Sequence, residues 1–313
     1  MSKTAFVFPG QGSQSVGMAR GFFDSSESAR SIFEKANDAM GMDLARLAFD
    51  GPQEMLDKTE YTQPALLTAS IAVLLALREK SAFTPVCFAG HSLGEYTALV
   101  AAGALDFSDA VRLVHLRGKF MQESVPQGVG KMCAILGLDL GAVEAICDSA
   151  SMDSARVVPA NINSPEQIVI SGHAAAVDIA ANLAKERGAK RVIPLQVSAP
   201  SHSPLMEKAA GRLGEELDRI TLNGLKAPVY TNVEAAPLID SARIKELLCL
   251  QLISPVRWVD TVRAMKADGV DTIIEVGPGK VLAGLVKRIE KDINALSLSE
   301  PADLEKVLGV LGA

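Results

Sequence analysis

One short stretch constrains this chain more than any other. Residues 90–94 read Gly-His-Ser-Leu-Gly, with an apolar run before them at 86–89 and a helix-like segment after them at 96–102. This pattern predicts a strand, a sharp turn and a helix, because a Cβ at either glycine would collide with the neighbouring backbone. Ser92 would then stand at the carboxyl end of the strand, beside a helix N-terminus that favours negative charge. The pattern favours a nucleophilic serine, and the alternative is a turn whose serine only caps the next helix.

Composition places the chain among globular proteins with a large core. Its 313 residues are 48% hydrophobic, which suffices for one large domain or two smaller ones. Lys and Arg number 31 against 37 Asp and Glu, so the net charge is −6 and we expect no nucleic-acid partner. The four cysteines are scattered through apolar surroundings without metal-type spacing, so we expect neither a disulfide nor a metal site.

The sequence also bears on location. Its longest apolar stretch, 64–77, is too short to span a bilayer, and the first residues lack a signal-peptide pattern. We therefore expect a cytoplasmic protein with no membrane partner.

A glycine-rich turn follows the first predicted strand. The strand covers 3–8, and residues 9–14 read Pro-Gly-Gln-Gly-Ser-Gln. A dinucleotide fingerprint would need a third glycine where the chain has Ser15, so a pyrophosphate site is not favoured. The turn could instead place Gln11 and backbone N–H groups near a reaction centre, or it could be a simple loop.

Two helices are predicted on either side of the Ser92 turn. The first begins at Pro64, and Gln63, just before it, faces either solvent or a pocket. The second covers 109–123, with Ser108 as its N-cap.

Arg117 lies where the second helix should present an apolar residue. It shares one stripe with Ala110, Val114 and Met121. A guanidinium aimed inward needs an anionic partner, because an unpaired buried charge costs several kcal/mol. That partner is either a buried Asp or Glu or the carboxylate of a substrate.

The middle of the chain changes pattern. Strands are predicted at 132–138, 156–161, 167–171 and 191–197, and helices at 141–148 and 174–187. This β-α-β-β-α-β order predicts a ferredoxin-like subdomain at 129–198, inserted into an α/β-hydrolase-like domain made of 1–128 and 199–313. Asn161 and Asn163 fall in the predicted turn between its second and third strands, where they either overhang a cleft or only form the turn.

His202 lies in the Pro- and Ser-rich segment 198–204 that follows the subdomain. The chain has four histidines, and loops are where a catalytic imidazole is expected, so His202 is the best general-base candidate. The alternative is a surface histidine. Further on we expect a helix near 205–217, a strand at 228–232, helices at 244–252 and from Trp258, a strand at 272–276 and a helix from Lys280.

Taken together, these motifs resemble the malonyl-CoA:acyl carrier protein transacylase family. The resemblance runs along essentially the whole chain and rests on residues 9–14, 61–65 (Tyr-Thr-Gln-Pro-Ala), 90–95, 200–202 (Pro-Ser-His), 275–279 (Glu-Val-Gly-Pro-Gly) and Arg117. It implies that Ser92 is the nucleophile and that His202 is its base, oriented by the main-chain carbonyl of Gln251. It also implies that Arg117 holds the malonyl carboxylate.

The resemblance further assigns an oxyanion hole to the backbone N–H groups of Gln11 and Leu93. Leu93 matches members that select malonyl over methylmalonyl units, while Ser254 stands where members commonly have Asn. We count Gln63, Asn161 and Asn163 as possible pocket residues.

The implied reaction moves a malonyl group from malonyl-CoA to the phosphopantetheine thiol of acyl carrier protein, in fatty acid biosynthesis. We expect a malonyl-serine intermediate, no bound cofactor or metal, and a monomer. An α/β-hydrolase esterase and a non-catalytic acyl-binding module are the rival interpretations.

Overall fold

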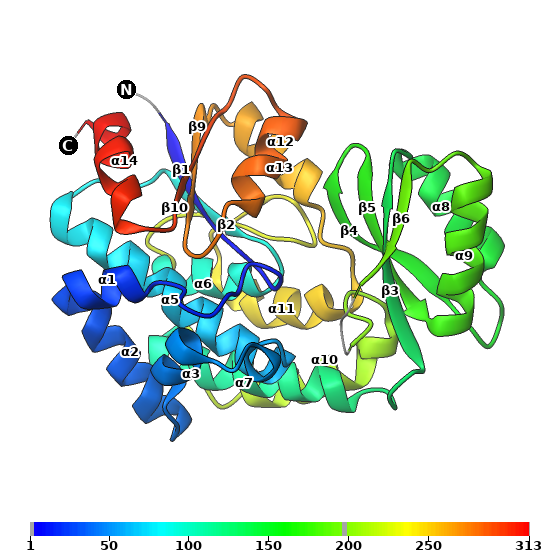
Figure 1. Ribbon diagram of the computed structural model, residues 1–313, viewed down its shortest axis with the longest axis horizontal. Coiled ribbons are helices and arrows are strands. Elements are labelled where there is room, and N and C mark those ends of the chain that lie inside the picture. Colours follow the sequence, from blue (N-terminus) through cyan, green and yellow to red (C-terminus); the bar gives the residue numbers. More distant parts are fainter. Residues whose placement is uncertain (1–2, 196–198, 313) are drawn as a thin grey trace.

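The chain forms two β-sheets with helices packed around them, an α/β fold (Figure 1). A computed structural model describes residues 3–195 and 199–312. The larger sheet has the strand order β10-β9-β1-β2-β7-β8, and the smaller one has the order β4-β5-β3-β6.

The larger sheet carries the Ser92 turn at the end of a central strand. Its strands pair in parallel from β10 to β7, and β8 is antiparallel to β7. The strands are β1 (Thr4–Phe8), β2 (Cys87–Gly90), β7 (Val229–Tyr230), β8 (Pro237–Leu238), β9 (Thr272–Val276) and β10 (Asn294–Leu298).

Helices cover both faces of this sheet, because alternate residues of its buried strands point to opposite sides. Phe6 and Phe88 face one core, and Val7 and Ala89 face the other. On the Phe6 side lie α1 (Arg20–Ser25), α2 (Glu27–Met40), α3 (Leu44–Asp50), α4 (Gln53–Leu56), α5 (Thr59–Lys80), α6 (Leu93–Ala101), α7 (Phe107–Glu123), α10 (Glu207–Leu217), α11 (Ile244–Ile253) and α14 (Leu304–Leu311). On the Val7 side lie α12 (Trp258–Ala267) and α13 (Val281–Ile289), drawn in orange to the right of β9 and β10 in Figure 1.

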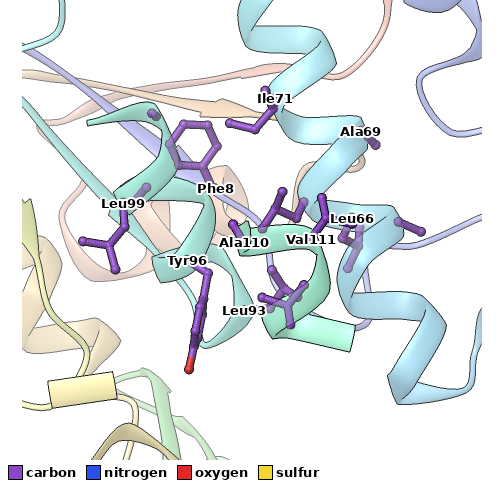
Figure 2. Packing of buried hydrophobic residues seen from close by; sticks show 14 of the residues in the cluster. Phe8, Leu66, Ala69, Ile71, Leu93, Tyr96, Leu99, Ala110 and Val111 are labelled. Atoms are coloured by element: carbon purple, nitrogen blue, oxygen red, sulfur yellow. The ribbon is translucent and has the colours of Figure 1, made fainter. Parts of the chain in front are cut away.

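The helix that follows Ser92 is held inside the first of these cores. Side chains of Leu66, Leu93 and Val111, from α5, α6 and α7, gather there (Figure 2). The base of the Ser92 turn is therefore fixed by close packing.

The prediction that a helix begins at Pro64 is wrong, because α5 starts five residues earlier and contains that proline. A proline within a helix leaves the carbonyl four residues before it without its N–H donor. Here that carbonyl belongs to Glu60, and it lies 2.8 Å from Nδ1 of His115 on α7. A side-chain donor thus replaces the missing backbone one, and Gln63 becomes part of the helix.

The N-cap predicted for α7 is also wrong. Asp106, and not Ser108, caps the helix: its carboxylate accepts hydrogen bonds from the N–H groups of Ser108 and Asp109. Both residue types favour this position, so local sequence leaves the choice open.

The smaller sheet has the predicted element order. Its elements are β3 (Gly130–Leu136), α8 (Leu140–Ala150), β4 (Val157–Ser164), β5 (Gln167–His173), α9 (Ala174–Glu186) and β6 (Arg191–Pro194). All its neighbouring strands are antiparallel. Asn161 and Asn163 both lie within β4 and not in the turn predicted at 161–165, because the strand continues to Ser164. The last predicted strand ends at Pro194, and residues 196–197 of that prediction lie outside the described residues.

Other segments differ from expectation. The strand predicted at 228–232 is shortened to Val229–Tyr230, the 205–217 helix begins with a 3₁₀ turn at Pro204–Met206, and the helix after β9 starts at Val281. The helices α1–α4 and α14 and the strands β8 and β10 were not predicted.

The prediction that the longest apolar stretch is too short to span a bilayer is wrong. Within the described residues, α5 is long and apolar enough to cross a bilayer by length and composition, contrary to the estimate from 64–77. However, 83% of an apolar 18-residue segment of this helix is buried inside the protein, as in a core helix of a globular protein.

The smaller sheet is joined to the segment between α11 and α12. Ile162 of β4 donates its N–H to the Val256 carbonyl, and Val256 donates to the Ala160 carbonyl. The strand β4 is thereby tied to the segment that follows Gln251.

Candidate active site

The turn at Ser92 is as sharp as the glycines predict. Ser92 has φ 51° and ψ −104°. A Cβ on Gly90 would lie 2.0 Å from the Gly94 carbonyl carbon, and one on Gly94 would lie 2.1 Å from the Phe8 oxygen. Only glycine fits at either place, and the strained serine projects from the turn.

Ser92 meets His202 across 110 residues of sequence. The Ser92 Oγ lies 2.8 Å from Nε2 of His202, and the other ring nitrogen, Nδ1, lies 2.7 Å from the Gln251 carbonyl oxygen. A carbonyl only accepts, so Nδ1 carries the hydrogen and Nε2 is left to accept the Ser92 proton. The pair is arranged as a nucleophile and its base, with a carbonyl where a carboxylate is often found.

Burial keeps this imidazole neutral. His202 is 2% exposed, and desolvation, together with the positive charge of Arg117, lowers its pKa from 6.5 to about 3. The ring is therefore ready to accept a proton at neutral pH.

Arg117 points inward, as its place on the apolar stripe predicts. Its side chain is 1% exposed. Nη1 donates to the Gln63 Oε1 at 2.8 Å, and Nη2 donates to the Gln251 Oε1 at 3.0 Å and to the Ser92 Oγ at 3.1 Å. Its Cζ also lies 5.2 Å from the centre of the Tyr96 ring.

The sequence allowed two partners for Arg117, a buried Asp or Glu of the chain or the carboxylate of a substrate. The first is not found in contact with it among the described residues. Within the residues that the structure describes, no Asp or Glu forms an ion pair with it. The guanidinium is held by neutral amide and hydroxyl oxygens, beside the Ser92 oxygen.

These side chains line a cavity of about 110 Å³ between the two sheets. Its walls come from both parts of the chain: Gln11, Thr59, Gln63, His91, Ser92, Leu93, Arg117, Met121, Met132, Asn161, Leu195, Ala199, Ser201 and His202. The cavity is small and is lined by both polar and apolar side chains, as in enzyme sites.

Gln11 and Leu93 line the same cavity as Ser92. Leu93 is the first residue of α6, so its N–H belongs to the free N–H groups of a helix N-terminus. The loop with Gln11 packs directly on the turn, since a Cβ on Gly10 would lie 2.4 Å from the His91 oxygen. The Gln11 side chain turns to Thr59, with Nε2 3.3 Å from its hydroxyl.

The three possible pocket residues have different surroundings. Gln63 is buried and contacts Arg117, and Asn161 lines the cavity. Asn163 instead has its Oδ1 2.8 Å from Nε2 of His91, so it steadies the residue next to Ser92.

Two residues at the site were missed by the sequence reasoning. Asn232 accepts from the Ser92 N–H at 2.7 Å and donates to the Gly90 oxygen at 2.7 Å, which braces the strained turn. Glu95 is a buried carboxylate bonded to the Gln251 side chain at 2.8 Å. The acidic residue at the first turn of an apolar helix was a signal for Glu95, whereas nothing local marks Asn232.

The described residues contain no group of three or more His, Cys, Asp or Glu side chains that could hold a metal ion.

Comparisons with known proteins identify the family of the chain. Residues 5–311 match the family model of the acyl transferase domain. The chain is 49% identical over 311 residues to the malonyl CoA-acyl carrier protein transacylase of Bacillus subtilis (strain 168), covering 99% of this chain and 98% of that one.

Solved structures are similar throughout. An acyl carrier protein S-malonyltransferase from Vibrio cholerae superimposes with a TM-score of 0.95 at 46% identity, covering 98% of this chain and all of that one. A malonyl-transacylase in complex with its type II PKS acyl-carrier protein has a TM-score of 0.96 at 44% identity, covering 99% of this chain and all of that one.

Proposed function

The chain belongs to the malonyl CoA-acyl carrier protein transacylase family, and we propose that it moves malonyl groups from malonyl-CoA to acyl carrier protein through a malonyl ester on Ser92. It is an acyltransferase of fatty acid synthesis.

One observation carries the choice of acyl group. A fully buried guanidinium, without an ion-pair partner among the described residues, lies 3.1 Å from the nucleophilic oxygen. A carboxylate that contacts Arg117 would therefore belong to a short acyl chain whose carbonyl is at Ser92. Malonyl has this arrangement of carboxylate and thioester, whereas acetyl has no carboxylate.

The first half-reaction uses the Ser92–His202 pair. As the Ser92 Oγ attacks the thioester carbonyl carbon, its proton passes to Nε2 of His202. The resulting oxyanion accepts hydrogen bonds from the Gln11 and Leu93 N–H groups, each worth roughly 3 kcal/mol of barrier. The C–S bond then breaks, CoA leaves as a thiol with the proton from His202, and the malonyl ester remains.

The second half-reaction is the reverse with a new thiol. The phosphopantetheine thiol of the carrier protein gives its proton to His202 and attacks the ester carbonyl. The C–O bond breaks, and Ser92 recovers the proton.

Arg117 supplies the selectivity. When acetyl-CoA occupies the site, the buried cation has no carboxylate, and such mismatches discriminate by about 10⁴. The Gln63 and Gln251 amides hold the guanidinium in a fixed plane, so the donors are positioned before the carboxylate arrives.

The proposal is tested by intact-protein mass after brief incubation with malonyl-CoA. We expect one malonyl adduct on the wild type, none on Ser92→Ala, and a normal adduct on Ser149→Ala, which removes an exposed serine. An unmodified wild type with intact malonyl-CoA would contradict the covalent mechanism and favour an acyl-binding module. Rapid release of free malonate without transfer to carrier protein would favour a hydrolase.

The division of the chain into domains is also a proposal. We infer a hydrolase-like catalytic domain, 1–128 and 199–313, and an inserted ferredoxin-like subdomain, 129–198. The antiparallel order β4-β5-β3-β6 supports the second assignment. That the enzyme is a cytoplasmic monomer without a bound cofactor stays a prediction.

A further inference from the structure

Glu95 is a buried carboxylate that the mechanism above does not use. It lies in the first turn of α6, three residues after Ser92, and is 1% exposed. Its Oε2 accepts the Asn232 N–H at 2.9 Å and the Gln251 Nε2 at 2.8 Å. A carboxylate this deep needs a positive charge nearby, since burial alone strongly disfavours its ionised form.

The Gln251 amide connects Glu95 to Arg117. Nε2 of this amide faces Glu95, while its Oε1 accepts from Nη2 of Arg117 at 3.0 Å. The two buried charges are thus separated by a single amide, and the charge of Arg117 lowers the pKa of Glu95. This is the nearest connection between Arg117 and a carboxylate that the described hydrogen bonds and ion pairs provide.

We propose that Glu95 is the counterion of Arg117 in the free enzyme and takes up a proton from solvent when the malonyl carboxylate binds Arg117. The inference rests on the proposed function. One carboxylate replaces another as the partner of the cation, and the proton on Glu95 keeps the net charge of the buried cluster unchanged. Glu95 is a positioning residue, because it acts on substrate through Gln251 and Arg117.

Electrostatics gives the direction of this exchange. Desolvation already raises the pKa of Glu95 from 4.5 to about 7, against the opposing effects of its two hydrogen bonds and of Arg117. A second carboxylate bound to Arg117 partly neutralises the positive charge that stabilises ionised Glu95, so the pKa of Glu95 rises further. Between these two pKa values, the bound enzyme holds more protons than the free one.

The other titratable groups around the cluster do not change their protonation state near neutral pH. Burial lowers the pKa of His202 to about 3 and also lowers that of His91. It raises the pKa of Tyr96 on α6 and of Cys249 on α11. Burial lowers the pKa of Arg117, but a guanidinium is not deprotonated in proteins, so Arg117 stays cationic.

The test is titration calorimetry of malonyl-CoA into Ser92→Ala, which binds without forming an ester. The measurement is made at about pH 7.5 in buffers of different ionisation heat, which reports the protons taken up on binding. We expect uptake of up to about three quarters of a proton for Ser92→Ala, because a Glu95 with a pKa of about 7 is already about one quarter protonated at this pH. We expect none for Ser92→Ala/Glu95→Gln, whose amide oxygen still accepts both hydrogen bonds. The Kd for malonyl-CoA of Ser92→Ala should rise by up to tenfold per pH unit above about pH 7. The Kd of Ser92→Ala/Glu95→Gln should stay constant over the same range.

The chain offers a matched control. Glu275 is also fully buried with a pKa raised to about 7, but it bonds the Ala283 N–H at the start of α13 and not the Arg117 cluster. Ser92→Ala/Glu275→Gln should therefore show the same uptake as Ser92→Ala. Acetyl-CoA, which lacks the carboxylate, should bind without uptake in all three proteins.

Each other result has a distinct meaning. Uptake that persists after Glu95→Gln, or is absent from Ser92→Ala, overturns the role of Glu95. If malonyl-CoA fails to bind any of the proteins, the proposed function fails, and this inference with it. Should Glu95→Gln not fold, infrared difference spectra of Ser92→Ala decide, because malonyl-CoA must then produce a protonated carboxyl band.

Discussion

Replacing Arg117 by alanine should change the acyl selectivity more than any other single substitution. The change removes a guanidinium that is 1% exposed and donates to Gln63, Gln251 and Ser92. The variant cannot form the buried ion pair between Arg117 and the malonyl carboxylate. Losing one partner of such a pair costs about 3–5 kcal/mol, so kcat/KM for malonyl-CoA should fall by roughly 10²- to 10⁴-fold. Transfer from acetyl-CoA forms no such pair, and the malonyl preference should narrow accordingly.

The assay compares kcat/KM for the two thioesters with purified carrier protein. Arg112→Ala is the control on the same helix, because Arg112 is half exposed and pairs with Asp109 at 2.7 Å. It should leave the preference unchanged. Arg117→Met, which retains side-chain volume, separates lost charge from a cavity and should behave like Arg117→Ala. An unchanged malonyl preference in folded Arg117 variants would refute the assigned role.

Two further predictions concern pH and packing. Desolvation lowers the pKa of His202 to about 3, so this base stays deprotonated as the pH falls through the ordinary histidine range. We therefore expect that kcat at saturating malonyl-CoA does not decrease near pH 6.5. A decrease there in the kcat–pH profile would contradict the neutral, buried base. Gly94→Ala should destabilise the protein by about 3 kcal/mol or more, since its Cβ would lie 2.1 Å from the Phe8 oxygen. Gly211→Ala, on α10 with nothing within 4 Å of the added carbon, should stabilise it by about 0.5–1 kcal/mol. Chemical unfolding measures both, and equal stabilities would show that the turn relaxes around the added methyl.

Prediction from the sequence succeeded where the signal was local. The glycines of the Ser92 turn, the β-α-β-β-α-β order and the inward side of Arg117 each follow from residues close together in the chain, and the structure has all three. It failed where a contact from another element decided the outcome. The start of α5 before Pro64 depends on His115, which lies on a different helix.

The composition of the site was likewise only partly readable. The resemblance pointed to the Gln251 carbonyl, but the Gln251 side chain also links Arg117 to Glu95. Asn232 follows the short strand β7, and parallel pairing of β7 with β2 brings it beside the Ser92 turn. No periodicity in its own segment marks that residue.

The sequence by itself determined the conformation of the Ser92 turn, the burial of Arg117 and the alternation of strands and helices, because sterics and hydrophobic periodicity act between residues close in the chain. Only the tertiary structure decided which distant groups meet: Ser92 with His202, Arg117 with Gln63 and Gln251, and Glu95 with both Gln251 and Asn232. Those contacts depend on strand order, register and helix packing. These are settled by burial of the whole core, and they also set the solvation that moves the pKa values of His202 and Glu95 in opposite directions.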